Sequence, residues 1–442
     1  MVRIGPMASR IFPIDRREFL AGLGAAALVA GFPRSASTAG PVSVPLRAKA
    51  GFLPLRPAQS ETPIWSLEAS ERPLRFRQGT SLEIALQNDL ERPVVSNWHG
   101  LDGIPSAEPL LGQTPLAPGA KARFTGSLRH AGTFFGDLRL LADSQGPPSR
   151  ALPLIVDEGQ PPTVDRDEVF LIEDFRLRGD GTAVGPVSDP RDAAPVYTVN
   201  GTISPDIAVH SNQRLRLRLI NGCQRHAVAT RIEGIDVRVM AMDGQPAEPF
   251  FARNGAIVLA PGNRTDVFID VTAQPGTTSA ILLHDGKEAR PIARLVTSNE
   301  PATRPVPLPP APPLPSNGLP ERLELKGAQR FDLVLNGAEW VAPAGFSATA
   351  APAFRVRANR VVVFALTNRA PIATTFHLHG HHFRLLDRLD DGWKPYWLDT
   401  LAIEPGETQR IALLAEYAGR YLLESTAMDW AAPKLLRWYS VE

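Results

Sequence analysis

The sequence is short of cysteine and of net charge. Cys223 is the one cysteine among 442 residues, so an intrachain disulfide is excluded and stability must come from packed cores. Lys and Arg number 47 against 46 Asp and Glu, without a long run of one sign. This balance argues against nucleic acid or an anionic membrane surface as a partner. The length and the 43% hydrophobic content are typical of a globular chain with roughly two to four packed units.

The N-terminus is similar to a processing segment. Arg16 and Arg17 precede an apolar run that is too short to cross a bilayer, and the small-residue stretch SASTAG follows. This order resembles a twin-arginine export signal with cleavage after Ala39. We therefore expect residues 1–39 to be a signal peptide that is removed on export, which leaves a periplasmic protein without a transmembrane anchor.

Long segments of helical period are also lacking. Short runs such as SLEIALQND, RLRLRLIN and VVVFALTN alternate apolar with polar residues and stop at Asn or Asp, which predicts half-buried strands. The 43 prolines and 35 glycines are typical of many strands joined by tight turns. The sequence therefore predicts an all-β fold of stacked antiparallel sandwiches.

One unit recurs along the chain, an alternating strand followed by a strand that ends in Asn. Asn88, Asn221 and Asn368 take matching places at intervals of roughly 130–150 residues, which predicts three homologous domains. Composition places a proline-rich, stiff linker before the last of them. The predicted boundaries are 40–162, 163–300 and 322–442 for the domains and 301–321 for the linker.

Motifs in all three predicted domains point to one family. They are NWHG in the first, AMDGQPAEPF and LAPGNRTDVFIDV in the second, and FHLHGHHFRLLD and GWKPYWLDTLAIEPGETQR in the third. From about residue 45 to its end the chain resembles the multicopper oxidases, the laccase group. The resemblance implies three tandem cupredoxin-like Greek-key β-sandwich domains. It also implies four short histidine motifs for a trinuclear copper cluster, and a Cys, two His and a weak axial Met for a blue copper.

The ligand motifs depart from the family pattern position by position. Three of the eight trinuclear histidines remain, and His99, His377 and His379 are thus the candidate residual metal ligands. The degenerate ligand positions are Asn97, Asp137, Arg139, Thr374, Glu424, Ser425, Thr426 and Trp430. Thr374, Ser425 and Trp430 take the blue-copper positions, where an alcohol cannot replace a thiolate.

Other residues of metal-ligand type match no ligand motif of the family. Cys223 lies in the middle domain, and we expect it to be a small buried residue. His381 and His382 follow the third motif and are expected to be structural or at the surface. The same expectation holds for His130, His210, His226 and His284.

The substitutions predict a rebuilt polar core at the former copper position. Asp137 and Glu424 would be costly to bury without a cation, and Arg139 supplies one. We therefore predict that Arg139 lies within ion-pair reach of Glu424, of Asp137 or of both, beside the three remaining histidines.

Two functions are compatible with this pattern, and neither is laccase or cuprous oxidase chemistry. The first is a non-redox envelope protein without a cofactor, which binds an unidentified protein or small molecule. Copper-free, twin-arginine-exported relatives make this plausible by analogy. The alternative is a copper-binding oxidoreductase that works from a reduced site on His99, His377 and His379. With one carboxylate these imidazoles would be a reasonable ligand set for copper or zinc.

Overall fold

The computed structural model describes residues 40–56, 61–143, 146–387 and 392–442. Pro41–Glu442 forms one compact unit, and the predicted signal peptide lies outside the described residues. In the part of the chain that is described, no helix combines the length and the apolar composition needed to cross a bilayer.

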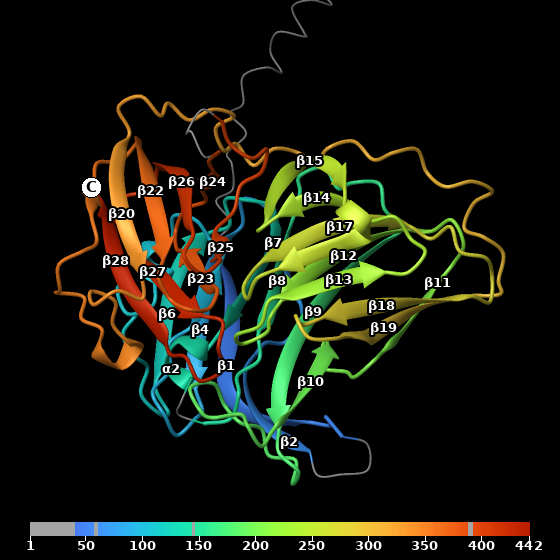
Figure 1. The fold of residues 1–442 in the computed structure, drawn as a ribbon, viewed down its shortest axis with the longest axis horizontal. Helices are drawn as coiled ribbons and strands as arrows, with labels where there is room; N and C mark the ends of the chain where they lie inside the picture. Colours follow the sequence, from blue (N-terminus) through green and yellow to red (C-terminus); the bar gives the residue numbers. More distant parts are fainter. Residues whose placement is uncertain (1–39, 57–60, 144–145, 388–391) are drawn as a thin grey trace, which may run out of the picture. The chain divides into compact units, whose positions relative to one another are not determined.

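The described strands form six sheets, which group in three pairs along the chain (Figure 1). Each pair encloses its own apolar core, and the predicted all-β fold is confirmed. The exact domain boundaries stay a prediction.

The first pair of sheets has the strand orders β2-β1-β4-β6 and β3-β8-β7-β5. Its elements are β1 (Val42–Leu53), β2 (Thr62–Glu68), β3 (Leu74–Arg77), β4 (Ser81–Asn88), β5 (Asn97–His99), η1 (Pro105–Ala107), β6 (Lys121–Ser127), β7 (Gly132–Asp137), α2 (Arg139–Ala142) and β8 (Leu152–Asp157).

The second pair has the orders β10-β9-β12-β17-β14-β15 and β11-β19-β18-β13-β16. Its elements are β9 (Arg166–Leu177), β10 (Ala194–Val199), β11 (Asp206–Val209), β12 (Arg214–Asn221), β13 (Val228–Ile232), β14 (Arg238–Met242), β15 (Gln245–Phe251), η2 (Arg253–Gly255), β16 (Ala256–Leu259), β17 (Arg264–Asp270), β18 (Thr278–His284) and β19 (Ala289–Thr297).

The third pair has the orders β20-β22-β26-β24 and β21-β28-β27-β23-β25. Its elements are β20 (Gln329–Leu335), η3 (Pro343–Gly345), β21 (Arg355–Val356), β22 (Arg360–Asn368), β23 (Thr374–Leu378), β24 (Arg384–Leu385), β25 (Thr400–Ile403), β26 (Thr408–Ala415), β27 (Gly419–Ala427) and β28 (Lys434–Val441).

The repeated asparagine makes the same hydrogen bonds in each pair of sheets. Asn88, Asn221 and Asn368 are buried, and each side-chain Nδ2 donates to a carbonyl four or five residues later and to a second, distant carbonyl. Each Oδ1 accepts from the backbone N–H two residues later, at 2.9 Å in all three copies. One amide thus satisfies three buried backbone groups wherever the strand ends, which is a physical reason for the repeat.

Strand β12 corrects one expectation, because its sequence RLRLRLIN predicts a half-buried strand and all eight residues are buried. The leucines face the core, while the arginines meet carboxylates on the other face. Arg216 pairs with Glu158 at 2.8 Å and with Asp266 at 2.5 Å, and Arg218 donates to Thr133 of β7 at 2.9 Å. Alternation therefore separates two buried faces here, because a second sandwich covers the polar one.

Candidate metal and ligand site

The family motifs of the first and last sandwiches meet on facing strands. β5 pairs with β7 so that Asn97 lies opposite Asp137, and β23 pairs with β27 so that His377 lies opposite Glu424. Residues two apart on a strand share a face, so His99 projects to the same side as Asn97. Asn97 Nδ2 donates to Glu424 Oε1 at 2.7 Å and so links the two sandwiches.

His379 is held between two carboxylates. Its Nδ1 lies 2.9 Å from Glu108 Oε1, and its Nε2 lies 2.9 Å from Glu424 Oε1. Burial opposes the positive charge, yet these carboxylates raise the pKa of His379 to about 10. A ring that carries protons on both nitrogens has no lone pair for a metal, so in this arrangement His379 is a cation rather than a ligand.

The main cation beside Glu424 is Lys434, which the sequence analysis missed. Lys434 Nζ lies 3.1 Å from Glu424 Oε2. Against the effect of burial, Lys434 and His379 hold the pKa of Glu424 well below its usual range. No ligand motif includes Lys434, and it comes within reach because β28 places it opposite Thr426 of β27.

Arg139 lies within ion-pair reach of Asp137, one of its two predicted partners. Its Nε lies 3.8 Å from Asp137 Oδ2, but the same nitrogen donates to Ser149 O at 2.9 Å, and Nη2 lies 3.6 Å from Glu173 Oε1. The chain leaves β7 after Asp137 and begins α2 at Arg139, and among the described residues the ion pairs of Arg139 are with Asp137 and Glu173 rather than Glu424. His99 and Arg139 lower the pKa of Asp137 to about 2, although burial acts in the opposite direction.

His99 and His377 offer nitrogens that have no hydrogen-bond partner among the described residues, namely both nitrogens of His99 and Nε2 of His377. Their ring centroids lie 4.5 Å apart, and His99 stacks on Phe135 at 4.1 Å. Burial, and then the nearby His377, lower the pKa of His99 to about 4, so His99 is neutral at pH 7. Both rings line a cavity of about 40 Å³ together with Glu424 and Lys434.

The residues at two blue-copper positions lie on the opposite face of β23 and β27 and are joined by Asn336. Asn336 Nδ2 donates to Thr374 Oγ1 at 3.3 Å, and Ser425 Oγ donates to Asn336 Oδ1 at 2.8 Å. Thr374 Oγ1 donates in turn to Asn368 Oδ1 at 3.3 Å. These neutral, mutually satisfied groups do not fit a blue copper ion, which needs a thiolate and imidazoles.

Trp430, at the third blue-copper position, packs against the middle sandwich. Its Nε1 donates to Gly185 O at 3.0 Å, and the Arg176 guanidinium lies 5.2 Å from the ring centroid. Thr426, by contrast, lines the cavity beside His377. The structure therefore brings most of the degenerate positions together but places Trp430 at a different contact.

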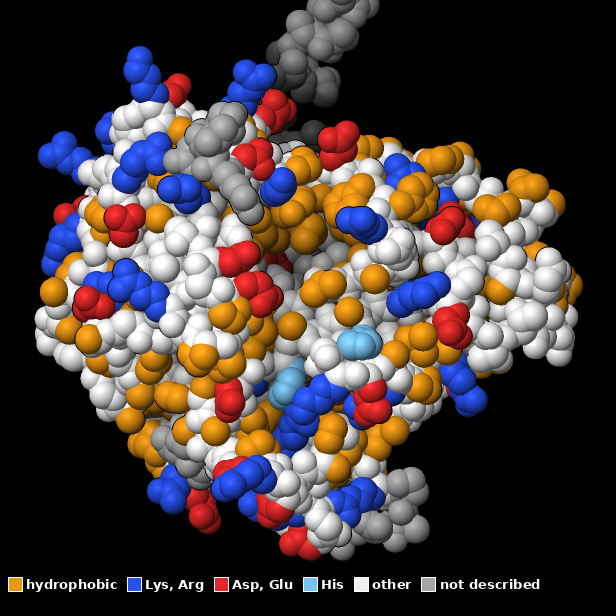
Figure 2. Space-filling model, in the orientation of Figure 1, with side chains coloured by type: hydrophobic (Ala, Val, Ile, Leu, Met, Phe, Trp, Pro, Cys, Tyr) orange, Lys and Arg blue, Asp and Glu red, His pale blue; other side chains and the backbone are white. Residues whose placement is uncertain are grey.

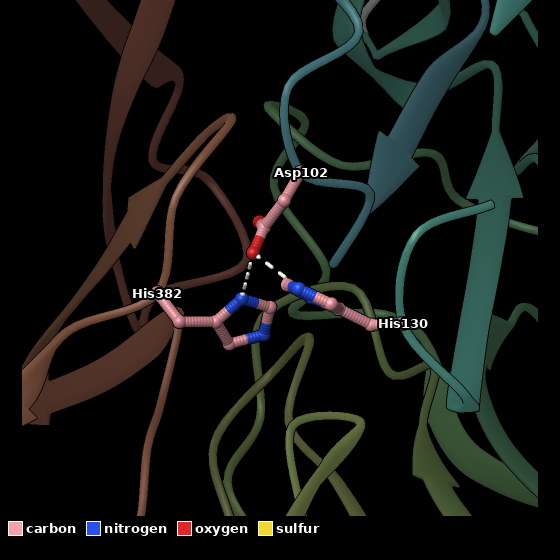
Figure 3. A group of neighbouring side chains, drawn as sticks. All are labelled: Asp102, His130 and His382. Atoms are coloured by element: carbon pink, nitrogen blue, oxygen red, sulfur yellow. Dashed lines mark hydrogen bonds and ion pairs between the residues drawn. The ribbon is translucent and has the colours of Figure 1, made fainter. Parts of the chain in front are cut away.

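A second group of metal-type side chains lies outside the predicted set (Figure 3). Asp102 Oδ2 lies 2.7 Å from His382 Nδ1 and 3.2 Å from His130 Nδ1, and all three residues are buried. In the described part of the chain this is the group of three His, Cys, Asp or Glu residues whose ligand atoms lie within 4.8 Å of one another. The sequence analysis expected no cofactor, whereas this cluster has side chains that could hold a metal ion. The three residues are distant from one another in the sequence and match no ligand motif. The one sequence signal for this cluster is the position of Asp102 just after NWHG.

The remaining residues of metal-ligand type have structural surroundings. Cys223 is buried, as predicted, and burial raises the pKa of its thiol. His381 Nδ1 lies 2.8 Å from the Tyr439 hydroxyl inside the last sandwich. His226 lies 3.0 Å from Asp174, and His284 is exposed.

Taken together, the fold and the motif remnants define a cupredoxin-like, three-sandwich protein of copper-oxidase type. Family models described as multicopper oxidase match residues 179–291 and 320–442. The chain belongs to the multicopper oxidase family.

Relatives agree with this assignment over most of the chain. The multicopper oxidase MmcO of Mycobacterium tuberculosis is 23% identical over 410 residues, covering 79% of this chain and 77% of its own length. The multicopper oxidase mco of Staphylococcus haemolyticus is 21% identical over 380 residues, covering 80% and 78%. The crystal structure of the multi-copper oxidase from Pseudomonas thermotolerans superposes with a TM-score of 0.77 at 25% identity, covering 92% of this chain and all of that one.

Proposed function

We propose that this chain is a non-redox member of the multicopper oxidase family, exported by the twin-arginine pathway to the periplasm. In this proposal it serves as a binding or scaffold protein of the cell envelope for a protein or small-molecule partner. The observation that carries the proposal is the position of His379, whose two ring nitrogens each face a carboxylate. The Thr374–Asn336–Ser425 hydrogen bonds support it, because electrons from a donor enter the family's copper centres at the blue-copper position.

One face of the described molecule carries charges of both signs. On the face drawn in Figure 2, basic and acidic side chains are interspersed among apolar ones. The arrangement is consistent with a binding protein whose partner is recognised by local chemistry rather than by an extended field of one sign.

A second candidate function has one specific observation in its favour. Within the described part of the chain, both nitrogens of His99 and Nε2 of His377 lack a hydrogen-bond partner, and His99 Nε2 lies 3.6 Å from Asp137 Oδ2. The two rings line the cavity with Asp137 and Glu424, and such a set could hold one copper or zinc ion. The chain would then be a copper-binding oxidoreductase with a reduced site, although His379 would have to give up its carboxylate partners to take part.

Copper loading separates these candidates. The processed protein is incubated with excess copper and desalted, and its metal content, visible spectrum and oxygen consumption with a phenolic donor are measured. The multi-copper oxidase from Pseudomonas thermotolerans serves as the positive control. We expect neither the intense thiolate-to-copper absorption at about 600 nm nor oxygen consumption. Donor-dependent oxygen consumption above a free-copper blank would overturn the proposal in favour of the second candidate.

A further inference from the structure

The buried cluster of Asp102, His130 and His382 draws on all three sandwiches. Asp102 follows β5 and His130 precedes β7 in the first sandwich, while His382 follows β23 in the last. The middle sandwich contributes the backbone oxygen of Asp243, which lies 2.8 Å from His382 Nε2. A group bound here would therefore touch the junction of the whole protein.

A chain of hydrogen bonds decides which nitrogen of His130 carries the proton. Ala131 N donates to Asn317 Oδ1 at 2.9 Å, and Asn317 Nδ2 donates to Ala131 O at 2.8 Å, which fixes the orientation of the Asn317 amide. Asn317 Nδ2 also donates to Gln245 Oε1 at 2.9 Å, so Gln245 directs its Nε2 donor at His130 Nδ1, 2.9 Å away. His130 Nδ1 must accept this bond, and its lone pair lies on that side of the ring.

A backbone carbonyl likewise decides which nitrogen of His382 carries the proton. A carbonyl can only accept, so His382 Nε2 donates to Asp243 O and the neutral ring has its lone pair on Nδ1. Figure 3 shows both rings turned with Nδ1 toward the Asp102 carboxylate. A histidine whose outer N–H is held by a backbone carbonyl is the usual orientation of a metal ligand.

Two donors satisfy the three atoms that converge at this point, namely a proton shared by His382 Nδ1 and Asp102, and the Gln245 amide. His130 Nδ1 lies 3.2 Å from the same carboxylate oxygen, and its single lone pair accepts the bond from Gln245. Two electron-rich atoms at this separation repel each other, and a positive ion that takes up the His130 lone pair in place of Gln245 removes that repulsion.

We propose that Asp102 Oδ2, His130 Nδ1 and His382 Nδ1 bind one divalent transition-metal ion of the zinc type. Two imidazoles and one carboxylate suit zinc and its neighbours, whereas magnesium and calcium prefer oxygen ligands alone. The ion replaces the proton between His382 and Asp102 and takes up the lone pair of His130 Nδ1, so the Gln245 amide must move off that nitrogen. Ligand atoms around a tetrahedral zinc lie about 3.3 Å apart, and the two nitrogens lie 2.7 and 3.2 Å from Asp102 Oδ2.

This site goes beyond the proposed function, because it is separate from the former copper position and needs no redox chemistry. Its three ligands are buried and come from the first and last sandwiches. The middle sandwich and the segment around Asn317 orient them. The bound ion would therefore hold the sandwiches together and stabilise the folded chain by mass action.

Zinc binding to the full processed protein tests the site. Protein treated with a chelator is incubated with zinc, and the stoichiometry, affinity and melting temperature are measured for the wild type, Asp102→Asn, His382→Gln and two controls. We expect one ion at this site and a higher melting temperature in the wild type, with affinity reduced at least about tenfold in both cluster variants. The control His284→Ala at the surface should bind as the wild type does, and His99→Gln reports any ion that is held at the other cavity. Unchanged affinity in the cluster variants would overturn the proposal.

Anomalous diffraction from zinc-soaked wild-type crystals gives a second measurement that does not depend on the folding of any variant. We expect a zinc peak about 2.0–2.2 Å from the three ligand atoms. A peak only at His99 and His377, or no peak at all, would contradict the proposed site. A parallel copper soak shows whether the site discriminates between the two metals.

Discussion

Glu424 and His379 form a buried ion pair, with 2.9 Å between Oε1 and Nε2. Each has a further partner of opposite charge, since Lys434 lies beside Glu424 and Glu108 beside His379. The four groups form a line of alternating charge that is neutral overall. A neutral line of this kind makes burial of two carboxylates tolerable in the absence of a multivalent ion.

Breaking this line should be costly. In Glu424→Gln the amide no longer balances Lys434 and His379, so we expect the free energy of unfolding to fall by about 3–5 kcal/mol, as for a buried pair that loses one member. Urea unfolding measures the loss. Glu442→Gln is the matched control, because its partner Arg355 and Glu442 itself are each 60% exposed, and it should show no measurable change. Equal losses of unfolding free energy in the two variants would show that this buried line of charges contributes no more than an exposed ion pair.

The metal-free protein should be most stable near pH 6.5. His379 has a pKa of about 10 when folded against 6.5 when unfolded, so its stabilisation is complete below pH 6.5 and is lost as the pH rises through 10. His99 has a folded pKa of about 4, so the unfolded chain binds more protons between pH 4 and 6.5 and stability falls as the pH drops through that range. Urea unfolding from pH 4 to 10 measures the loss of stability on both sides of this optimum, the acid limb and the alkaline limb of the pH profile.

Two variants assign the limbs of this pH profile. His379→Gln should flatten the alkaline limb and His99→Gln the acid limb. Neither limb should vanish, because His382, with a pKa raised to about 9, and His381, with a pKa lowered to about 4, act in the same two directions. An alkaline limb that is unchanged in His379→Gln would contradict the ion-pair assignment.

Removing Lys434 should make the former copper position responsive to metal. In Lys434→Met, Glu424 loses one of its two cations, and its Oε2 can share an ion with the nitrogens of His99 and His377 that lack a hydrogen-bond partner in the described chain. Zinc should then raise the melting temperature more in this variant than in the wild type, as differential melts will show. Arg139→Met is the control and should respond less, because Arg139 is directed to Ser149 and Glu173. A larger zinc response in the Arg139 variant would reverse this ranking.

Export should depend on the arginine pair near the N-terminus. With Arg16 and Arg17 both replaced by Lys, we expect full-length precursor to accumulate in the cytoplasm. Cell fractionation followed by immunoblotting of the wild type and the double variant measures this. Processed protein in the periplasm of the variant would contradict a twin-arginine signal.

The fold was predictable because its signals are local. The apolar and polar residues of the strands alternate within short segments. The repeated Asn88, Asn221 and Asn368 mark equivalent strand ends, and their side chains donate to carbonyls only four or five positions later. The i, i+2 spacing of Asn97 and His99 likewise fixed which side chains share a face. Strand alternation could not show that the arginines of β12 are buried, because the carboxylates that receive them come from distant segments.

The site was predictable in its position but not in its charge partners. Sequence motifs located Glu424 and His379, whereas Lys434 and Glu108 belong to no motif and reach the site through strand pairing and a loop. The sequence analysis chose Arg139 as the cation for this site, but in the structure Arg139 donates to Ser149 and lies near Glu173. A partner that is selected by tertiary distance leaves no periodic trace in the sequence.

The arginine face of β12 has a consequence for how the molecule folds. Arg216 and Arg218 can stay hydrated until the first sandwich covers them, so this part of the contact exposes charge rather than apolar surface while the middle sandwich folds. The apolar part of the contact, where Leu171 and Ile220 meet Phe135 and Ala151, is a separate cluster. Intermediates of multidomain proteins aggregate mainly through exposed apolar surface. The charged face of β12 therefore reduces the apolar area that a folded middle sandwich exposes before its neighbour docks on it.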